Sequence, residues 1–482
     1  MSAATALAAT AAHSADSSTQ LETITVTGSR LPSDLSTYAG SVTLVSRAQI
    51  EQQAEYSPDL GQILASVVPG LAVASSGSYS NFDQTLRGRK PAVFIDGIPV
   101  SVTLRDGGRD NRLIGLDAIG SVETISGATA IYGLGGAGGL INYITRTPGQ
   151  GPAQFQTHVD LGSSLTHPAG SLSWSLGQSA LGRIDRFSYV VTGDYQSYSS
   201  LFDAEGGRIP PDPQMQGGIA DTHTYNVFGK LGYDLTDEQH LYVMGSDYDT
   251  LQRTRYSSGT GKFRVSKSSA LPVPPPGEPQ FTREALGSAE YVNDDLLGST
   301  LDVDAYYSRY SSLFEFYAYP YYPPTGGQTE IDNIERGVRS TVNTPFELRS
   351  RKGSVIWGMD YSIIDARQAL TDGRVLVPYL RQRAAAPFAQ ASAPVASWLT
   401  LNAGVRSEHD AMSVDTFTTI GLYAPSLPGG NTVQGGTIDY SATLLNAGAV
   451  VTPFKSGSLA GASAYASYSE GFSVGDFGRA LR

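Results

Sequence analysis

Residues 84–100 read QTLRGRKPAVFIDGIPV, and residues 118–148 read AIGSVETISGATAIYGLGGAGGLINYITRTP. Three short apolar runs lie within them, each next to glycine, at 93–95, 122–125 and 140–144. Asp96-Gly97 directly follows the first run, and glycine accepts the positive φ of a tight turn there. Short β elements joined by glycine turns predict a compact α/β unit around these two stretches.

The segment before this unit adds a strand and a helical pattern. Residues 42–45 are apolar or β-branched and predict a strand, and Ser46 with Gln49 three residues later fits a helix capping box. Apolar residues then recur at the helical period between 60 and 67. Two polar stretches are expected to form outward-facing loops at one end of the unit, namely 75–83 and 103–113.

The composition limits the class of protein. The net charge of −12 over 482 residues argues against a nucleic-acid partner, which favours a basic surface. The absence of cysteine excludes disulfides and thiolate metal sites, and the six histidines show no metal-ligand spacing. No nucleophile–base pair stands out, and no Lys-Ser/Thr follows the glycine cluster at 133–139 as a P-loop requires. We expect neither an enzyme nor a resident cofactor.

After residue 153 the pattern changes to a period of two. Apolar residues alternate with polar ones over 187–196, 301–308 and 399–406. A soluble sandwich also alternates, so this feature alone does not decide the fold. No run of eighteen apolar residues occurs, so a membrane-spanning version of this chain has to be a β-barrel.

The connections favour the barrel. Short turns are expected near 236–239, 293–297, 349–352, 395–397 and 454–457. Long polar segments lie between them, at 197–222, 251–280, 310–330, 367–383 and 407–439. Outer-membrane barrels combine short periplasmic turns with longer external loops. The 27 tyrosines also suit a membrane–water interface, because the ring is apolar and its tip polar.

The motifs of the first unit, in order and spacing, resemble the plug domain of TonB-dependent outer-membrane receptors. One difference is that the family often has a basic residue where this chain has Ser126. The residues that carry the resemblance are Arg87, Gly88, Arg89, Asp96, Gly97, Gly127, Tyr132, Gly133 and Asn142. The resemblance implies a mostly β protein with a small α/β plug inside an antiparallel transmembrane β-barrel.

The stretch before the plug resembles the TonB box, the segment that the energy-coupling protein TonB pairs with. Alternating β-branched residues with free backbone groups suit the addition of a partner strand, although such a segment alone is more often an ordinary edge strand. The box residues are Glu22, Thr23, Ile24, Thr25, Val26, Thr27 and Gly28. The expected division is 1–20 leader or signal-peptide remnant, 21–30 TonB-box segment, 31–150 plug and 151–482 partial barrel.

The resemblance further implies active uptake of a scarce chelate across the outer membrane of a Gram-negative bacterium. A ferric siderophore is the expected cargo, with iron present only as part of it; residues 466–472 and 476–479 also resemble a barrel segment of ferric-siderophore receptors. The expected partners are TonB, the chelate and outer-membrane lipid. Alternatives are cobalamin or oligosaccharide uptake, a surface binding or adhesion protein without transport, and a passive porin, which the plug disfavours.

An anionic, aromatic chelate would be held by cations and aromatic rings. The expected loops supply both, because the 251–280 segment is locally basic and the 310–330 segment is rich in tyrosine and phenylalanine. The candidate ligand-binding residues are Tyr79, Arg105, Arg109, Arg112, Phe316, Tyr317 and Tyr319.

The strand count bears on completeness. About thirteen strands are expected after residue 153, whereas bacterial single-chain barrels have even numbers and plugged transporters about 22. Residues 466–479 also resemble a segment that lies mid-barrel in relatives. We therefore expect a C-terminally truncated chain with a full plug and an incomplete wall that has unpaired first and last strands.

Overall fold

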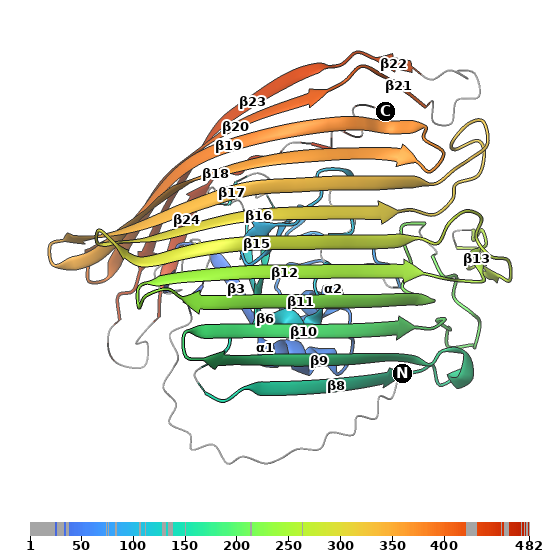
Figure 1. Ribbon diagram of the computed structural model, residues 1–482, viewed down its shortest axis with the longest axis horizontal. Coiled ribbons are helices and arrows are strands. Elements are labelled where there is room, and N and C mark those ends of the chain that lie inside the picture. The colour runs from blue at the N-terminus through green and yellow to red at the C-terminus, as the bar shows by residue number, and fades with distance from the viewer. Residues whose placement is uncertain are drawn as a thin grey trace.

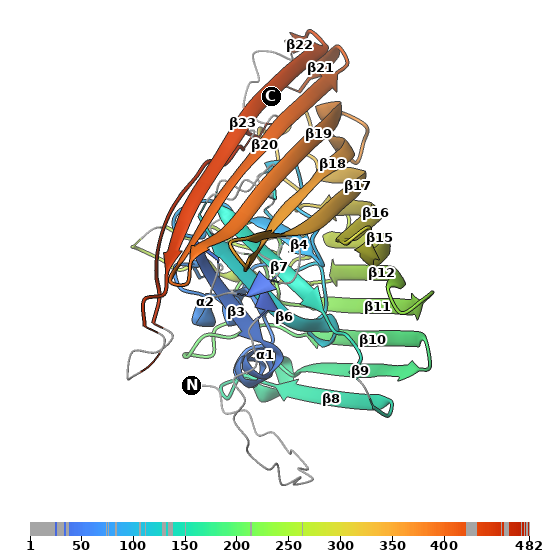
Figure 2. The same ribbon diagram turned by 90° about the vertical axis from the view of Figure 1, so that its left-hand side faces the viewer.

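A small plug and a large curved sheet make up the protein (Figures 1 and 2). The computed structural model describes residues 38–481 except 74, 76, 82–83, 106–107, 111, 128–131, 134–137, 150, 213–214, 263, 421–430, 455, 457–461, 474, 477 and 479–480, and the backbone of 25–26 and 33–34. Within these residues no helix is both long and apolar enough to cross a membrane.

The plug contains one mixed sheet with two short helices. Its elements are β3 (Ser41–Ser46), α1 (Arg47–Ala54), α2 (Leu60–Val67), β4 (Ala92–Ile95), β5 (Ile98–Pro99), the 3-10 helix η3 (Leu116–Ala118), β6 (Ile119–Ser126) and β7 (Gly139–Thr145). The sheet order is β3-β6-β7-β4-β5, and only β4 and β7 are parallel. The capping box at Ser46 and Gln49 is confirmed, and so is the α/β unit.

Within the described residues the wall is a single antiparallel sheet of thirteen strands, as the sequence predicts. In spatial order these are β24 (Ala464–Ser469), β23 (Gly436–Val451), β20 (Leu399–Val414), β19 (Val375–Ala396), β18 (Arg351–Leu370), β17 (Thr329–Leu348), β16 (Ser299–Leu313), β15 (Phe281–Leu296), β12 (Gln239–Gln252), β11 (Thr222–Asp234), β10 (Phe187–Tyr198), β9 (Ser173–Ile184) and β8 (Gln154–Gly162). Among the described residues β8 and β24 do not pair with each other, so the sheet is an open trough around the plug (Figure 2).

The connections alternate between short turns at one end of the wall and longer segments at the other. The long segments at 197–222, 251–280 and 310–330 are confirmed. They and their neighbours carry the remaining short elements, η4 (Pro168–Gly170), β13 (Ser257–Ser258), β14 (Ala270–Leu271), β21 (Phe417–Thr419) and β22 (Asn431–Val433).

Two expected loops are wrong in extent. Residues 367–383 are not a long loop, because β18 continues to Leu370 and β19 begins at Val375. Residues 407–439 likewise lose both ends to β20 and β23. In the first of these stretches, Arg367 and Arg381 instead form ion pairs with aspartates of neighbouring strands on the outer face.

The two faces of the wall differ as the alternation predicts. On β10, β11 and β12 the exposed side chains include Val191, Val227 and Val243, whereas Thr192 and Phe228 are buried against the plug. The outer face is thus largely apolar, and the inner face carries the polar and aromatic groups that contact the plug.

Glycine is required where β7 begins. Gly139 has φ +105°, and a Cβ placed on it would collide with the backbone oxygen of Ile125 on β6. Gly127, which directly follows β6, has φ +95° but open space around its missing Cβ. Both positions have a positive φ that strains any other residue, but only Gly139 adds a steric clash. Comparing alanine substitutions at the two positions therefore measures the clash apart from the backbone strain.

Replacing Gly139 by alanine should destabilise the plug by about 1–3 kcal/mol more than Gly127→Ala, because only the first change forces β6 and β7 apart. The measurement is the protease sensitivity of the plug in the full-length protein over a urea series. Equal effects of the two substitutions would contradict the close approach at Gly139.

Candidate functional site

The end of the plug lies beneath segments that fold inward from the wall. Ile219 donates its N–H to the carbonyl of Gly77 (3.0 Å), and Tyr79 donates to the carbonyl of Gly217 (2.8 Å). The Tyr79 hydroxyl lies 2.9 Å from the Thr224 hydroxyl of β11. The expectation that 75–83 and 103–113 face outward is wrong for much of both stretches, because these inward contacts cover them.

Arg109 is the least compensated cation at this apex. Its side chain is 6% exposed, and its guanidinium donates to the hydroxyl of Ser312 on β16 (2.8 Å). Its Nε and Nη2 have no hydrogen-bond partner, and among the described residues it has no ion pair with a carboxylate. Burial lowers the pKa of Arg109. A buried charge without a counter-ion is costly, so an anion that reaches Arg109 would gain binding energy.

Arg105 shares an aromatic ring with Arg109. Their guanidinium carbons lie 4.5 and 4.1 Å from the centre of the Phe314 ring. Arg105 also donates to the side-chain oxygen of Gln216 (2.9 Å). Two guanidinium groups over one buried ring concentrate positive charge beside an aromatic side chain.

Arg112 has a different environment from the other two apical arginines. It forms two hydrogen bonds of 2.9 and 2.8 Å with the carboxylate of Asp59, the N-cap residue of α2, and donates to the carbonyl of Tyr79. Both partners of the ion pair are buried. Arg112 therefore joins the helix to the apex, which leaves Arg105 and Arg109 as the cations available to a ligand.

The aromatic candidates are brought together only in part. Tyr317 stacks on Tyr321 with ring centres 4.5 Å apart, and its hydroxyl donates to the carbonyl of Met215. Phe316 is half-buried next to Gly326. Tyr319 is 54% exposed and lies apart from this stack. In the basic segment, Lys267 pairs with Asp203 and Glu205 of the neighbouring connection.

Two acidic residues at the apex, Asp212 and Glu315, belong to no sequence motif, so the sequence alone does not single them out. Asp212 accepts the N–H groups of Gln216 and Gly217 (3.0 and 2.8 Å) and so shapes the inward segment. Glu315 is buried, and its burial, with a smaller contribution from Asp212, raises its pKa to about 8.

The Asp96-Gly97 turn of the plug motif fixes the plug against the wall. Asp96 accepts the N–H of Thr145 (2.8 Å) and its hydroxyl (2.5 Å), and Lys230 of β11 donates to the same carboxylate at 2.8 Å. Gly97 donates its N–H to the side-chain oxygen of Asn142 (2.9 Å). Asp96 and Gly97 both have positive φ, as a type I′ turn requires.

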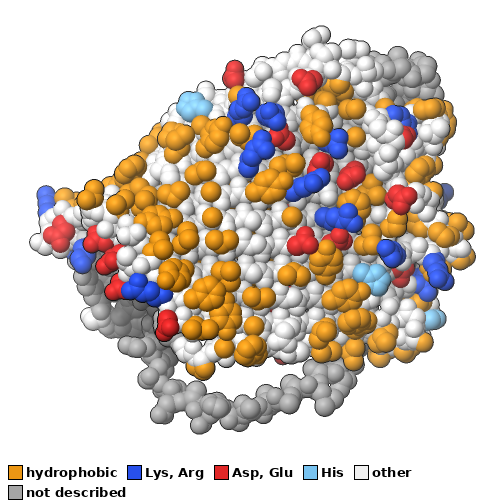
Figure 3. Space-filling model, in the orientation of Figure 1, with side chains coloured by type: hydrophobic (Ala, Val, Ile, Leu, Met, Phe, Trp, Pro, Cys, Tyr) orange, Lys and Arg blue, Asp and Glu red, His pale blue; other side chains and the backbone are white. Residues whose placement is uncertain are grey.

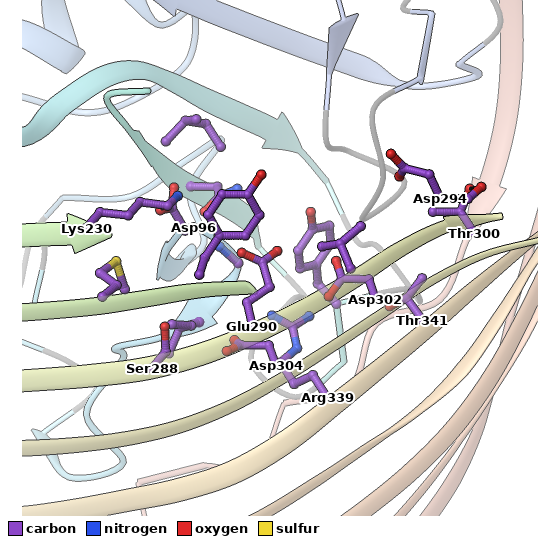
Figure 4. Close-up of a pocket in the computed structure, with 18 residues that line it drawn as sticks. Asp96, Lys230, Ser288, Glu290, Asp294, Thr300, Asp302, Asp304, Arg339 and Thr341 are labelled. Carbon is purple, nitrogen blue, oxygen red and sulfur yellow. Dashed lines mark hydrogen bonds and ion pairs between the residues drawn. The ribbon is translucent and has the colours of Figure 1, made fainter. Parts of the chain in front are cut away.

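A cavity of about 350 Å³ that is lined by several charged residues adjoins this turn (Figure 4). The wall side carries Glu290, Asp302, Asp304 and Arg339, whose labelled side chains point from β15, β16 and β17 toward the plug. Arg339 also lies within 3.4 Å of Asp360 on β18. No group of three His, Asp or Glu suited to a metal ion occurs among the residues that the structure describes.

The other motif residues occupy turns and close contacts. Arg87 and Gly88 both have positive φ, in a tight turn closed by the Leu86 N–H and the Arg89 carbonyl (2.8 Å). Tyr132 packs edge-on against Phe94, with ring centres 5.2 Å apart. A Cβ on Gly133 would collide with the guanidinium of Arg406, a buried wall residue paired with Glu408 and Asp360.

The TonB-box prediction lies mostly outside the described residues, which exclude Glu22, Thr23, Ile24, Thr27 and Gly28. The described part is β1 (Thr25–Val26), which pairs antiparallel with β2 (Ser33–Asp34). The backbone at Thr25 and Val26 is therefore extended and paired within the chain.

An α/β domain fixed inside a curved antiparallel wall with a largely apolar outer face is the architecture of a plugged β-barrel. The TonB-dependent Receptor Plug Domain family matches residues 34–140, and the TonB dependent receptor-like β-barrel family matches 273–482. The chain belongs to the TonB-dependent receptors.

Similar proteins include the rhizobactin receptor of Rhizobium meliloti (strain 1021), which is 27% identical over 98% of this chain and 66% of its own length. The ferric aerobactin receptor of Klebsiella pneumoniae is 26% identical over 89% of this chain and 61% of its own. The chain thus spans less than two thirds of these relatives. The ferric-catecholate import receptor Fiu of Escherichia coli K12, in its open form, shares the fold with TM-score 0.65, 14% identity and coverage of 91% and 70%.

Replacing Lys230 by glutamine should loosen the plug, because Asp96 then loses its wall cation while remaining half-buried. A hydrogen bond to a charged group contributes about 1.5–3 kcal/mol, so amide exchange in β4 and β5 should accelerate about tenfold or more. Lys352→Gln, at the exposed start of β18, is the matched control. An unchanged rate of amide exchange in the Lys230 variant would show that this ion pair does not hold the plug to the wall.

Proposed function

We propose that the protein to which this chain belongs takes up a ferric siderophore across the outer membrane of a Gram-negative bacterium. The observation that carries this proposal is the buried, uncompensated Arg109 beside Arg105 and Phe314. This group favours a ligand that has both negative charge and a flat apolar surface. The relatives named as receptors for rhizobactin and ferric aerobactin support the same class of cargo.

The proposed mechanism needs motion but no covalent chemistry. The chelate displaces the inward segments 209–219 and 314–328 and contacts the apical arginines. The plug transmits this change to the stretch at 22–28, which the coupling protein TonB then pairs with as an added strand. Energy from that partner separates Asp96 from Lys230 and opens a path along the wall. Iron enters as cargo and is not a resident cofactor of the receptor.

A growth assay identifies the chelate and tests the proposal. A strain that lacks the full-length receptor should fail to grow on one ferric siderophore of a panel that includes rhizobactin and ferric aerobactin, and the gene should restore growth. Restored uptake of cobalamin or an oligosaccharide instead would replace the siderophore reading. Binding of a chelate without any uptake would favour a surface binding protein.

Arg109→Gln should weaken binding of the chelate identified in this way by about tenfold or more, since the charge is buried and a charge-assisted hydrogen bond is lost. Added salt screens the exposed part of the attraction between the chelate and the arginine. The difference in affinity between the wild type and the variant should therefore become smaller as the salt concentration rises. Arg253→Gln, in the exposed segment after β12, is the control, and titration calorimetry is the measurement. Equal affinities of the Arg109 variant and the wild type would reject the arginine site and favour a neutral ligand.

Val26→Pro should block uptake and leave surface binding intact, because proline removes a backbone donor and fixes φ within the proposed pairing strand. Uptake of radioactive iron and binding at 0 °C separate the two steps, and the Val26→Ala variant controls for loss of the side chain. If binding fell as much as uptake, the stretch would have a structural role and no coupling role.

A further inference from the structure

The outer face of the wall carries a patch of charge on strands β12, β15, β16, β17, β18 and β19. Figure 3 places charged side chains among the apolar ones on the half of this face nearer the long connections. The patch consists of six arginines and five acids, namely Arg283, Arg309, Arg336, Arg367, Arg381, Arg383, Asp247, Asp249, Glu330, Asp332 and Asp365. We call the six arginines the arginine ladder.

The strand register orders these residues into rows. The first row below the long connections pairs Asp249 with Arg283 and Asp332 with Arg367. The second row passes from Asp247 through Arg309 and Asp365 to Arg381. The third passes from Gly245 through Arg336 to Arg383 and contains no acid.

Directly below the third row the wall becomes apolar. The next row consists of Val243, Ala289, Ala305, Val338, Tyr361 and Ala385. From β12 to β19 the row nearest the apolar band thus holds only cationic and neutral side chains, and the acids of these strands lie farther toward the connections. The same row continues through Ala411 to Asp439 on β23, which lies outside the patch. This order is that of a lipid leaflet, in which acyl chains give way to the headgroups.

The ion pairs leave the arginines available. Asp332 is shared by Arg309 (3.5 Å) and Arg367 (3.9 Å), and Asp365 by Arg336 (3.2 Å) and Arg381 (2.5 Å). The five paired arginine side chains are 44–57% exposed, whereas their three aspartate partners are 14–16% exposed. The carboxylates lie beneath the guanidinium groups and hold them in place.

Guanidinium groups suit phosphate in particular. Each presents several N–H donors in a planar fork that matches the oxygens of a phosphate, and it is less strongly hydrated than an ammonium. The charged patch contains no lysine. A row of half-exposed guanidiniums immediately above an apolar band therefore matches a ligand with phosphate groups attached to acyl chains.

We propose that the arginine ladder binds the phosphate groups of lipids in the outer leaflet. The lipid acyl chains lie along the apolar rows below, and Arg309, Arg336 and Arg383 contact the phosphates. The inference rests on the outer-membrane placement proposed above. It assigns to the wall a lipid site separate from the apex, on the opposite face of the sheet.

The test uses the full-length receptor in detergent with the variant Arg309→Gln, Arg336→Gln, Arg383→Gln. This combination leaves Asp332 with Arg367 and Asp365 with Arg381, so no aspartate loses both partners. The matched control is Arg349→Gln, Arg351→Gln at the turn between β17 and β18, at the other end of the wall. The probes are bis-phosphorylated lipid A and the same lipid after removal of its phosphates, with binding measured by native mass spectrometry.

The wild type should prefer the phosphorylated lipid, and the triple variant should lose on the order of 100-fold in affinity for it, because each arginine near a charged leaflet contributes roughly 1 kcal/mol. Binding of the dephosphorylated lipid should be the same in all three proteins. Equal binding of both lipids by the wild type, or an unaltered preference in the triple variant, would overturn the inference.

Siderophore uptake by the triple variant separates this inference from the proposed function. Intact uptake with no phosphate-selective lipid binding overturns the lipid site alone. If the wild-type receptor transports no ferric chelate, the proposed function is overturned. The lipid measurement in detergent still tests whether the arginine ladder binds phosphorylated lipid.

Discussion

The carboxylate of Asp96 holds together three parts of the molecule. It closes the plug turn through Thr145 of β7, and it pairs with Lys230 from the wall. Asn142 holds the next residue of the same turn. Because these contacts meet in a partly buried space, each depends on the others, and loss of one leaves a charge or a donor unsatisfied. The position of the plug, and hence of the apex, depends on this turn.

Along the strands of the wall, side chains alternate between the plug side and the outer side of the sheet. Inward side chains such as Lys230, Arg339 and Arg406 are polar because they meet the plug and the cavity beside it. Outward side chains are apolar over most of the surface because they face lipid. Near the long connections the outward positions of the strands become charged. For this reason the sequence of residues 367–383 suggests a loop, whereas all but the turn at 371–374 is strand.

The apex and the arginine ladder use the same side chain in different ways. Arg109 is buried without a counter-ion, so its charge is available only to a ligand that displaces the segments above it. The ladder arginines are half-exposed and supported by carboxylates beneath them, so they need no displacement. Arg112, which the sequence does not distinguish from Arg109, is neutralised by Asp59 and serves the fold.

The sequence by itself determined the plug turns, the capping box at Ser46, the alternation of the wall and its thirteen strands. These features are local, since glycine at a positive φ, a hydroxyl at a helix start and a period of two act within a few residues. Only the tertiary structure decided that Arg105 and Arg109 share the Phe314 ring, and that the 199–221 segment folds over Tyr79. It also decided that arginines from separate strands form one ladder. Such groupings join residues far apart in the chain, and no local preference encodes which strands lie side by side or which loops fold inward.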